Sequence, residues 1–310
     1  MAGELIPSID VSSLNGSQAE RMRCAKSIGR ACEEVGFFHI VGHGVDSGQR
    51  VRVFDVAERF FALPLATKMD VALSAESGFR GYFPFKGEVT NPLIGGDPKE
   101  GYDISFAPDD GVHRKGNRWP EEPSDLRAVM TEYYRRLAEI GRTLSRGFAL
   151  ALDLPEDFFT AKLDRPTAIL RLLHYPPVGR VPARHEIPIS GCGAHSDYGY
   201  LTVLAQDEQG GLQVETRAGQ WIDVPPIPDA FVCNIGEMMA LWTGNRFRAT
   251  PHRVIRVAPG SRYSIPFFFH PNPDVLIETL PNCAPADEAL GCPPVTSGEY
   301  LRRRQLGAYV

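Results

Sequence analysis

The sequence predicts an α+β protein in which helices come first and an antiparallel β core follows. In the first half of the chain, apolar residues recur every three or four positions, which is the spacing of amphipathic helices. After about residue 165, short segments rich in β-branched and aromatic residues are separated by Gly and Pro, which is typical of a β sandwich or barrel. This separation of helices from strands along the chain is the α+β order.

The first elements expected are a short strand, a capped helix and a second strand. The short strand is expected at 5–10. Ser17 can cap the helix that follows, and Gly36 stands where that helix should end. The sequence FFHIV at 37–41 predicts the second strand, because it is apolar and rich in aromatic and β-branched residues.

Two further helices are expected, at 47–62 and at 123–152. Pro64 stops the first of them, and Ser124 can cap the second. The apolar stripe of the long helix consists of Leu137, Ile140, Leu144, Phe148 and Leu152. Between the two helices, residues 74–120 are rich in Gly, Pro, Asp and Lys, which predicts a long irregular stretch that serves as a lid or a binding loop.

The second half of the chain predicts short strands that end in a helical tail. The strands are expected at 168–175, 200–207, 212–216, 221–225, 230–236, 252–257 and 263–269. The helical tail is expected at 296–306.

Composition argues against several classes of protein. The formal net charge is −5, whereas nucleic-acid binders usually carry a basic excess. The first residues lack the basic and apolar segments of a signal peptide, and no apolar run approaches the roughly 18 residues of a membrane span. The six cysteines form no CxxC pair, which argues against a zinc ribbon. We therefore expect a cytoplasmic protein with free thiols.

The sequence His195-Ser196-Asp197 is the first candidate metal site. In an extended chain, residues i and i+2 point to the same face, so an imidazole and a carboxylate would lie side by side. His252 opens a later predicted strand and can supply a third ligand. Two histidines and one carboxylate that leave other positions open are the ligand set of non-haem Fe(II) oxygenases. A bare HxD is common by chance, and His195 and Asp197 could instead pair in a turn.

Arg262 and Ser264 supply the context that favours the metal site. They share one face of a predicted strand, ten residues beyond His252. A guanidinium and a hydroxyl can together hold a carboxylate, which a keto acid bound at an open iron site would present. The alternative is a surface arginine beside a strand serine.

At these residues the chain resembles the isopenicillin N synthase-like branch of the 2-oxoglutarate- and Fe(II)-dependent oxygenases. Matching segments cover nearly the whole chain in family order. They include GFFHIVGHGV (36–45), KEGYDI (99–104), LRLLHYPP (170–177), GAHSDYGYLTVLAQDEQGGLQV (193–214) and RYSIPFFFHPNPD (262–274). The resemblance implies a double-stranded β-helix, or jelly-roll, core with flanking N-terminal helices and a C-terminal helix.

The resemblance also implies site residues and cofactors. It makes His195, Asp197 and His252 the catalytic iron ligands, with Fe(II), 2-oxoglutarate and O2 as cofactors and co-substrates. It makes Arg262 and Ser264 the clamp for the distal carboxylate of 2-oxoglutarate. Tyr175 stands where the family often places a tyrosine that contacts the co-substrate. Arg171 alternates with it on the same strand, so it too is expected to face the site and to bind the co-substrate. At Leu173, where the plant members commonly have asparagine, the sequence departs from the family.

We expect one catalytic unit over 1–310. It would comprise a helical and lid region (1–120), a long helix and connection (121–164), the jelly-roll core (165–275) and a tail (276–310). The family's chemistry implies hydroxylation, desaturation or ring closure of a small molecule by ferryl-mediated abstraction of hydrogen from a C–H bond, with release of succinate and CO2. Secondary metabolism is the expected setting.

Other functions remain open. Oxidases of the same branch use no 2-oxoglutarate, although they too have an Arg-x-Ser pair. An activity like that of the ethylene-forming enzyme is a further alternative, because GEVT at 87–90 is similar to a segment that meets arginine there. Two further alternatives are a jelly-roll binding protein without catalytic activity and an oxygenase that modifies DNA or protein.

Substrate contacts are expected mainly in the irregular stretch. The candidates are Phe79, Arg80, Tyr82, Phe83, Phe85, Glu88, Thr90 and, next to a metal ligand, Tyr198. The alternative is that these aromatic residues simply pack the lid against the core. The expected partner is a small polar or amino-acid-like metabolite, with neither nucleic acid nor a membrane involved.

Overall fold

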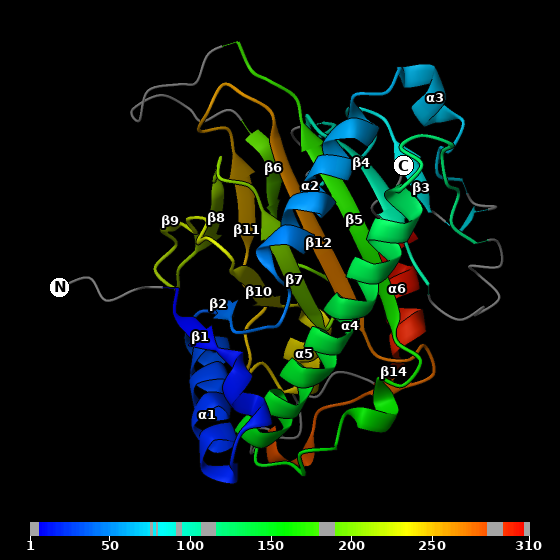
Figure 1. Ribbon diagram of the computed structural model, residues 1–310. Helices are drawn as coiled ribbons and strands as arrows, with labels where there is room; N and C mark the ends of the chain where they lie inside the picture. Colours follow the sequence, from blue (N-terminus) through cyan, green and yellow to red (C-terminus); the bar gives the residue numbers. More distant parts are fainter. Residues whose placement is uncertain are drawn as a thin grey trace.

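The computed structural model describes residues 6–74, 77–78, 80–90, 95–106, 116–179, 190–283 and 294–306. These residues form two facing β-sheets, with helices packed on the outer side of the larger one (Figure 1). The larger sheet has the order β1 (Ser8–Asp10), β2 (Phe37–Val41), β10 (Phe231–Ile235), β7 (Leu201–Gln206), β12 (Arg262–His270), β5 (Thr167–Tyr175), β4 (Glu100–Ile104) and β3 (Gly81–Phe83). The smaller sheet has the order β6 (Ser190–His195), β11 (His252–Ile255), β8 (Leu212–Glu215) and β9 (Trp221–Asp223).

Two of the predicted helices begin at side-chain caps. In α1 (Gln18–Glu34), the Ser17 hydroxyl accepts from the Glu20 amide, and the Glu20 carboxylate accepts from the Ser17 amide over 2.7 Å. This reciprocal capping box satisfies two amides that a helix end would leave unpaired. In α2 (Ser47–Phe61), Asp46 accepts from the Gln49 amide over 2.8 Å. The capping role predicted for Ser17 is confirmed.

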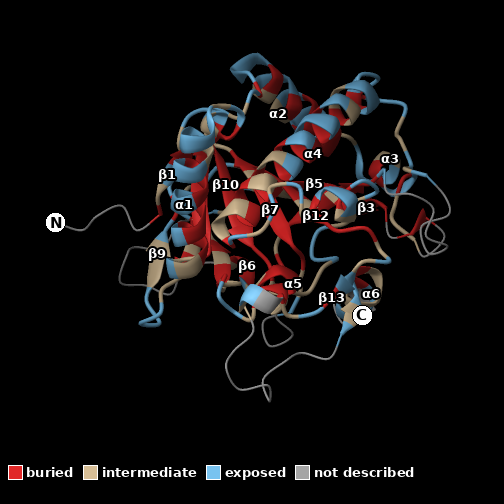
Figure 2. Cartoon of the chain, turned by 90° about the horizontal axis from the view of Figure 1, so that it is seen from below, coloured by how far each residue is buried: buried red, intermediate tan, exposed pale blue. Residues whose placement is uncertain are grey.

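The long helix α4 (Leu126–Ala151) covers the outer face of the larger sheet. The predicted cap at Ser124 is wrong, because the helix starts after Asp125 and has no side-chain cap hydrogen bond. The predicted apolar stripe is confirmed, since all five of its residues are buried. Figure 2 shows the buried residues gathered on the sheet and on the sides of α1 and α4 that face it.

The stretch 74–120, predicted to be irregular, contains two strands of the larger sheet. β3 pairs with β4, and β4 pairs with β5 in antiparallel register. The alternation that marks a strand is weak here because both strands contain glycine. Gly101 has no side chain where the Phe83 ring lies, and a Cβ at this position would come within 2.2 Å of that ring. The helix α3 (Leu65–Met69) precedes these strands.

All seven strands predicted after residue 165 are present, with ends displaced by at most two residues. The elements missed in this half include β6, whose sequence SGCGAH lacks a hydrophobic alternation, and the short helix α5 (Glu237–Trp242). The segment forms the strand β6 because it pairs with β11, where Val254 lies opposite Cys192. The hairpin of β13 (Leu276–Ile277) and β14 (Val295–Thr296) leads into α6 (Ser297–Leu306), the predicted helical tail.

Two hydrophobic clusters divide the interior. The larger cluster joins the outer face of the sheet to the helices and extends from Ile9 to Leu301. The smaller cluster lies between the two sheets and includes Leu173, Tyr175 and Val254. None of the helices in the described part of the chain is long and apolar enough to cross a membrane. The space beside the smaller cluster is the cavity described next.

Candidate active site

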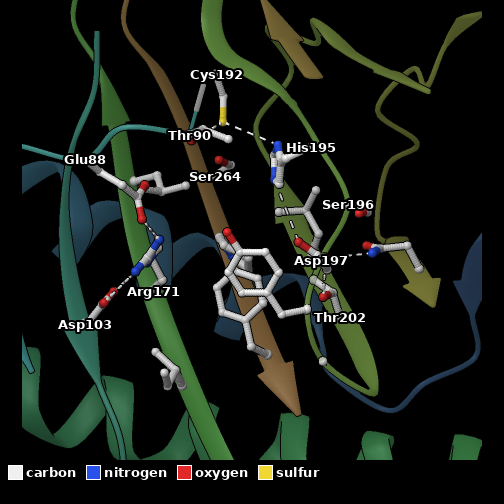
Figure 3. Close-up of a pocket in the computed structure, with 18 of the residues that line it drawn as sticks. Glu88, Thr90, Asp103, Arg171, Cys192, His195, Ser196, Asp197, Thr202 and Ser264 are labelled. Atoms are coloured by element: carbon white, nitrogen blue, oxygen red, sulfur yellow. Dashed lines mark hydrogen bonds and ion pairs between the residues drawn. The ribbon is translucent and has the colours of Figure 1, made fainter. Parts of the chain in front are cut away.

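A cavity of about 390 Å³ lies between the two sheets. Alternate residues of β5, from Thr167 to Tyr175, and of β12, from Arg262 to His270, line one side of it. The ends of β6 and β11 line the other side, and the segment 88–90 and α6 complete the wall. Figure 3 shows side chains from the segment 88–90, β5, β6 and β12 that face the cavity.

The predicted metal ligands meet at the ends of β6 and β11. His195 is the last residue of β6, and His252, the first residue of β11, lies directly opposite it in the register. Their Nε2 atoms lie 3.8 Å and 3.7 Å from Oδ1 of Asp197, and the three ligand atoms lie within 4.8 Å of one another. The imidazole of His195 and the carboxylate of Asp197 lie side by side, as predicted, although β6 ends at His195 and Asp197 lies in the following loop.

Hydrogen bonds orient each ligand. Nδ1 of His195 lies 2.8 Å from the Gly193 carbonyl, and Nδ1 of His252 lies 3.2 Å from the Thr250 carbonyl. Each Nδ1–H therefore donates to a carbonyl, which leaves the Nε2 lone pairs for a metal. Two imidazoles and one carboxylate oxygen fit Fe(II) in chemistry and in number, with Asp197 and His252 buried and His195 half-buried.

The surroundings set the protonation of these ligands. Burial would raise the pKa of Asp197, but the charges of His252 and His195 hold it below its usual range. Burial lowers the pKa of His252 to about 4. Burial alone would also lower the pKa of His195, but the charge and hydrogen bond of Cys192 outweigh it and raise that pKa to about 9. Asp197 and His252 thus have their ligating forms at neutral pH, whereas a metal must displace a proton from His195.

The predicted carboxylate clamp lies at one end of the cavity. Arg262 and Ser264 share the inner face of β12, and Nη1 of Arg262 donates to the Ser264 hydroxyl over 3.1 Å. Tyr175 is the β5 partner of Arg262, whose guanidinium carbon lies 4.9 Å from the centre of the Tyr175 ring. Nε of Arg262 donates to the Gly210 carbonyl over 2.7 Å, which fixes the guanidinium plane. All three side chains are buried and line the cavity.

Arg171 lines the cavity, as predicted, and its guanidinium lies between two carboxylates. Its Nε and Nη2 each donate to Asp103 over 2.7 Å, and Nη1 donates to Glu88 over 2.7 Å (Figure 3). Nζ of Lys99 lies 2.9 Å from the other oxygen of Glu88 and 3.1 Å from Asp97. Burial would raise the pKa of Glu88, but the charges of Arg171 and Lys99 hold it well below its usual range.

These five residues form a row of alternating charges, which we call the charged wall: Asp97, Lys99, Glu88, Arg171 and Asp103. The sequence reasoning missed the role of Lys99. A signal was available, because Lys99 and Asp103 are an even number of residues apart on the β4 side of the sheet and so share a face. Nζ of Lys99 also lies 3.2 Å from Sγ of Cys192, which connects the charged wall to the strand that carries His195.

The substrate candidates divide between the cavity and other places. Arg80, Glu88, Thr90 and Tyr198 line the cavity. The other three described candidates do not. Tyr82 lies in the outer core, where its hydroxyl donates to Glu100 over 2.5 Å; Phe83 packs in the cluster between the sheets; and Phe85 is 49% exposed. Phe79 lies outside the described residues. Lining residues that the sequence reasoning missed include Ser105, Ile169, Phe268, Leu301 and Arg302.

A jelly roll with two histidines, one carboxylate and an arginine clamp around one cavity defines the class of non-haem Fe(II) oxygenases. Residues 166–271 match the 2OG-Fe(II) oxygenase superfamily model, and residues 6–122 match the model for the N-terminal part of the non-haem dioxygenase in morphine synthesis. The chain is 36% identical over its full length to the 2-oxoglutarate-Fe(II) type oxidoreductase hxnY of Emericella nidulans, covering 90% of that protein. It is 32% identical to the homoarginine-6-hydroxylase 2-ODD-233 of Oryza sativa, with 98% of each chain covered.

The comparison with solved structures supports the same class of oxygenase. A full-length Neurospora crassa protein, solved in complex with alpha-KG and thymine, superposes with a TM-score of 0.86 at 30% identity, covering 97% of this chain and 96% of that one. The chain belongs to the 2-oxoglutarate- and Fe(II)-dependent oxygenase superfamily, in its isopenicillin N synthase-like branch. The fold is the double-stranded β-helix, and the cofactors are Fe(II) and 2-oxoglutarate, with His195, Asp197 and His252 as the metal triad. The predicted family, fold and cofactors are confirmed.

Proposed function

We propose that this protein hydroxylates a small, polar, amino-acid-like molecule, with conversion of 2-oxoglutarate and O2 to succinate and CO2. The observation that carries the proposal is that one cavity is lined by the metal triad, the carboxylate clamp and four residues of the charged wall: Lys99, Glu88, Arg171 and Asp103. Hydroxylation is preferred over desaturation and ring closure because relatives at 32% to 35% identity are named as homoarginine-6-hydroxylases.

The clamp is proposed to hold the co-substrate by its distal carboxylate. Arg262 offers N–H groups and Ser264 a hydroxyl, and a charge-assisted pair of this kind is both strong and directional. The Tyr175 ring stacks on the guanidinium and limits its movement. Because these groups are buried, little water competes for them. Bound Fe(II) supplies the chemistry that activates O2 and oxidises a substrate C–H bond, and the protein's own residues decide which bond is presented.

The substrate is proposed to bind between the charged wall and the metal triad. Glu88, Arg171 and Arg80 supply charges of both signs, and Thr90 and Tyr198 supply hydroxyl groups. Ile169 and Phe268 add apolar surface to the same cavity. A molecule with charged or amide groups on a short apolar frame fits this lining, because polar groups fix its orientation and apolar surface contributes to affinity. We also propose that 1–310 acts as one catalytic unit, which the continuous outer core supports.

The test is a screen for succinate release. The protein is incubated with Fe(II), 2-oxoglutarate, O2 and a reductant, and single candidates are added, beginning with homoarginine, other amino acids and thymine. A true substrate should raise succinate release above the substrate-free rate and gain one oxygen atom from ¹⁸O2. If a broad panel yields a turned-over compound that gains no oxygen, the reaction is desaturation or ring closure instead.

A second candidate is an oxidase that needs no 2-oxoglutarate. It is favoured by one observation: the chain is 32% identical to the 1-aminocyclopropane-1-carboxylate oxidase of Dictyostelium discoideum, covering 85% of that protein. In that case the clamp would hold the substrate's own carboxylate. Turnover with substrate, Fe(II), O2 and reductant but without 2-oxoglutarate would establish this alternative and exclude the first.

A further inference from the structure

The C-terminal helix α6 forms part of the cavity wall. Gly298, Leu301 and Arg302 line the cavity beside Pro273, which precedes the β13 strand. The helix is anchored at its start, where the Ser297 amide donates to the Val275 carbonyl over 2.8 Å and the Gly298 amide donates to the Pro273 carbonyl over 2.9 Å. Its position therefore helps to set the shape of the space that a substrate fills.

Glu237, the first residue of α5, connects this helix to the loop that carries the metal ligands. Its backbone amide donates to the Asp197 carbonyl over 2.8 Å. Its Oε1 accepts from the hydroxyl of Ser196, the residue between His195 and Asp197, over 2.6 Å. Its Oε2 accepts from the Tyr300 hydroxyl over 2.9 Å and forms an ion pair with Arg304.

The two carboxylate oxygens of Glu237 thus serve two different parts of the protein. Oε1 binds the metal loop and Oε2 binds α6, so the side chain is a bridge between them. A second contact runs in parallel, because the guanidinium carbon of Arg304 lies 4.7 Å from the centre of the Tyr198 ring. Tyr198 follows Asp197 directly and lines the cavity. Helix α6 is therefore connected to both neighbours of Asp197: to Ser196 through Glu237, and to Tyr198 directly.

We propose, building on the function proposed above, that Glu237 is a positioning residue that couples the seating of α6 to the orientation of the metal loop. A substrate that packs against Leu301 and Arg302 stabilises the position of α6. Through its hydrogen bond to Ser196, Glu237 then stabilises the orientation of the two ligands beside Ser196, which are His195 and Asp197. The coupling favours oxidation of a bound substrate over unproductive consumption of 2-oxoglutarate. No bond changes in this step; only the positions of side chains do.

Three substitutions separate the arms of the bridge. Arg304→Ala removes the ion pair of α6 with Glu237 and its contact with the Tyr198 ring, and leaves the hydrogen bond from Tyr300 to Glu237. Ser196→Ala removes the contact of the Glu237 side chain with the metal loop. Glu237→Gln keeps the size of the side chain and one carbonyl oxygen but loses the second acceptor, so one arm is lost. Arg303→Ala is the matched control, because Arg303 lies on the same helix and loses an ion pair to Glu299, but it touches neither the cavity nor the loop.

The first measurement needs no turnover. Hydrogen–deuterium exchange of the peptide that spans 195–200 is compared between the wild type and each variant. We expect exchange in this loop to be faster by about fivefold in Arg304→Ala and in Glu237→Gln, as for the loss of a partly exposed ion pair with its hydrogen bond. Arg303→Ala should match the wild type. Unchanged exchange in both test variants would overturn the proposal, even if the screen finds no substrate.

The second measurement uses a substrate found by the screen. The ratio of product to succinate should fall by about threefold or more in Arg304→Ala, with kcat for product reduced more than KM changes. Arg304→Lys should recover part of the ratio. The double variant Arg304→Ala with Ser196→Ala should lose no more than the more impaired single variant, because the two changes break one chain of contacts. Additive losses would mean that α6 and the metal loop act independently. Absence of succinate from the wild type would instead count against the proposed function alone.

Discussion

Asn234 of β10 donates a hydrogen bond of 2.7 Å to Oδ2 of Asp197, and this bond decides which carboxylate oxygen faces the two histidines. Thr202 of β7 donates to the same oxygen over 2.5 Å. Oδ1 is left for the metal, so a residue that is not a ligand determines the direction of one that is.

The first prediction concerns this hydrogen bond. Asn234→Ala should lower the apparent Fe(II) affinity by about 10- to 100-fold, because partners of metal ligands typically contribute that much. Asp197→Ala should lower it further while circular dichroism shows an intact fold. Anaerobic Fe(II) titration measures both, with the exposed Asn282 as a control in Asn282→Ala. Wild-type affinity in Asn234→Ala would show that Asp197 is held without this bond, and wild-type affinity in Asp197→Ala would refute the triad.

The second prediction concerns the clamp. Arg262→Leu should raise KM for 2-oxoglutarate by about 10- to 150-fold, since a hydrogen bond to a charged group contributes about 1.5–3 kcal/mol and each 1.4 kcal/mol is a factor of about ten. Fe(II) affinity should change little, because Arg262 is not a ligand. Arg262→Lys should recover part of the loss, since the charge remains without the guanidinium geometry. Arg253→Leu is the control, because Arg253 stacks on Trp221 outside the cavity. If Arg262→Leu and Arg253→Leu raise KM for 2-oxoglutarate equally, Arg262 does not hold the co-substrate.

The third prediction concerns pH. The pKa of His195 is raised to about 9, so at lower pH its proton must leave before a metal binds. Apparent metal affinity should therefore fall by about tenfold for each unit of pH below that value and level off above it. The pKa of His252, at about 4, is too low to add to this slope near neutral pH. Titration with Co(II) between about pH 6 and pH 10 measures the profile.

Cys192 is the residue to change in testing that profile. Its charge and hydrogen bond raise the pKa of His195, so Cys192→Ala should lower this pKa and move the midpoint of the affinity profile toward acid. Cys233→Ala is a control, because Cys233 is buried in the outer core away from the cavity. A midpoint unmoved by Cys192→Ala would mean that Cys192 does not control His195.

The fourth prediction concerns substrate choice. Glu88→Gln should change the relative kcat/KM for charged and neutral substrates by about tenfold or more, because it removes a charge from the cavity lining. Succinate release without substrate should remain, since Glu88 touches neither the triad nor the clamp. Phe85→Ala, in the same segment but exposed, should leave the preference unchanged. If Glu88→Gln keeps the wild-type preference, the charged wall does not select the substrate.

Much of the site could be predicted because its residues lie close together along the chain. His195 and Asp197 are two residues apart, as are Arg262 and Ser264, and spacing of this kind is visible in a sequence. His252 was found only through the context of the other four. The outer faces of the elements were also predictable, because burial against α4 imposes a regular apolar pattern.

The residues that were missed come together only in the folded chain. Lys99 meets Cys192 across 93 positions of sequence, and Glu237 meets Tyr300 across 63. β6 was missed because its glycines remove the alternation that marks a strand, and only pairing with β11 makes it one. Tyr82 and Phe83 were wrongly predicted to line the cavity. The sequence pattern of an aromatic residue in a lid is the same whether its side chain faces a substrate or packs in the core.

The charged wall also limits how this enzyme can change during evolution. Three carboxylates and two cations alternate along it, and the side chains of Asp97, Lys99 and Asp103 are almost fully buried. Loss of Arg171 leaves the buried carboxylate of Asp103 without its ion-pair partner, which costs about 3–5 kcal/mol, whereas joint replacement of this pair by apolar residues is close to neutral. Members of the superfamily should therefore differ at Arg171 and Asp103 together. New specificities would then arise by double substitutions, with few stable single-substitution intermediates between them.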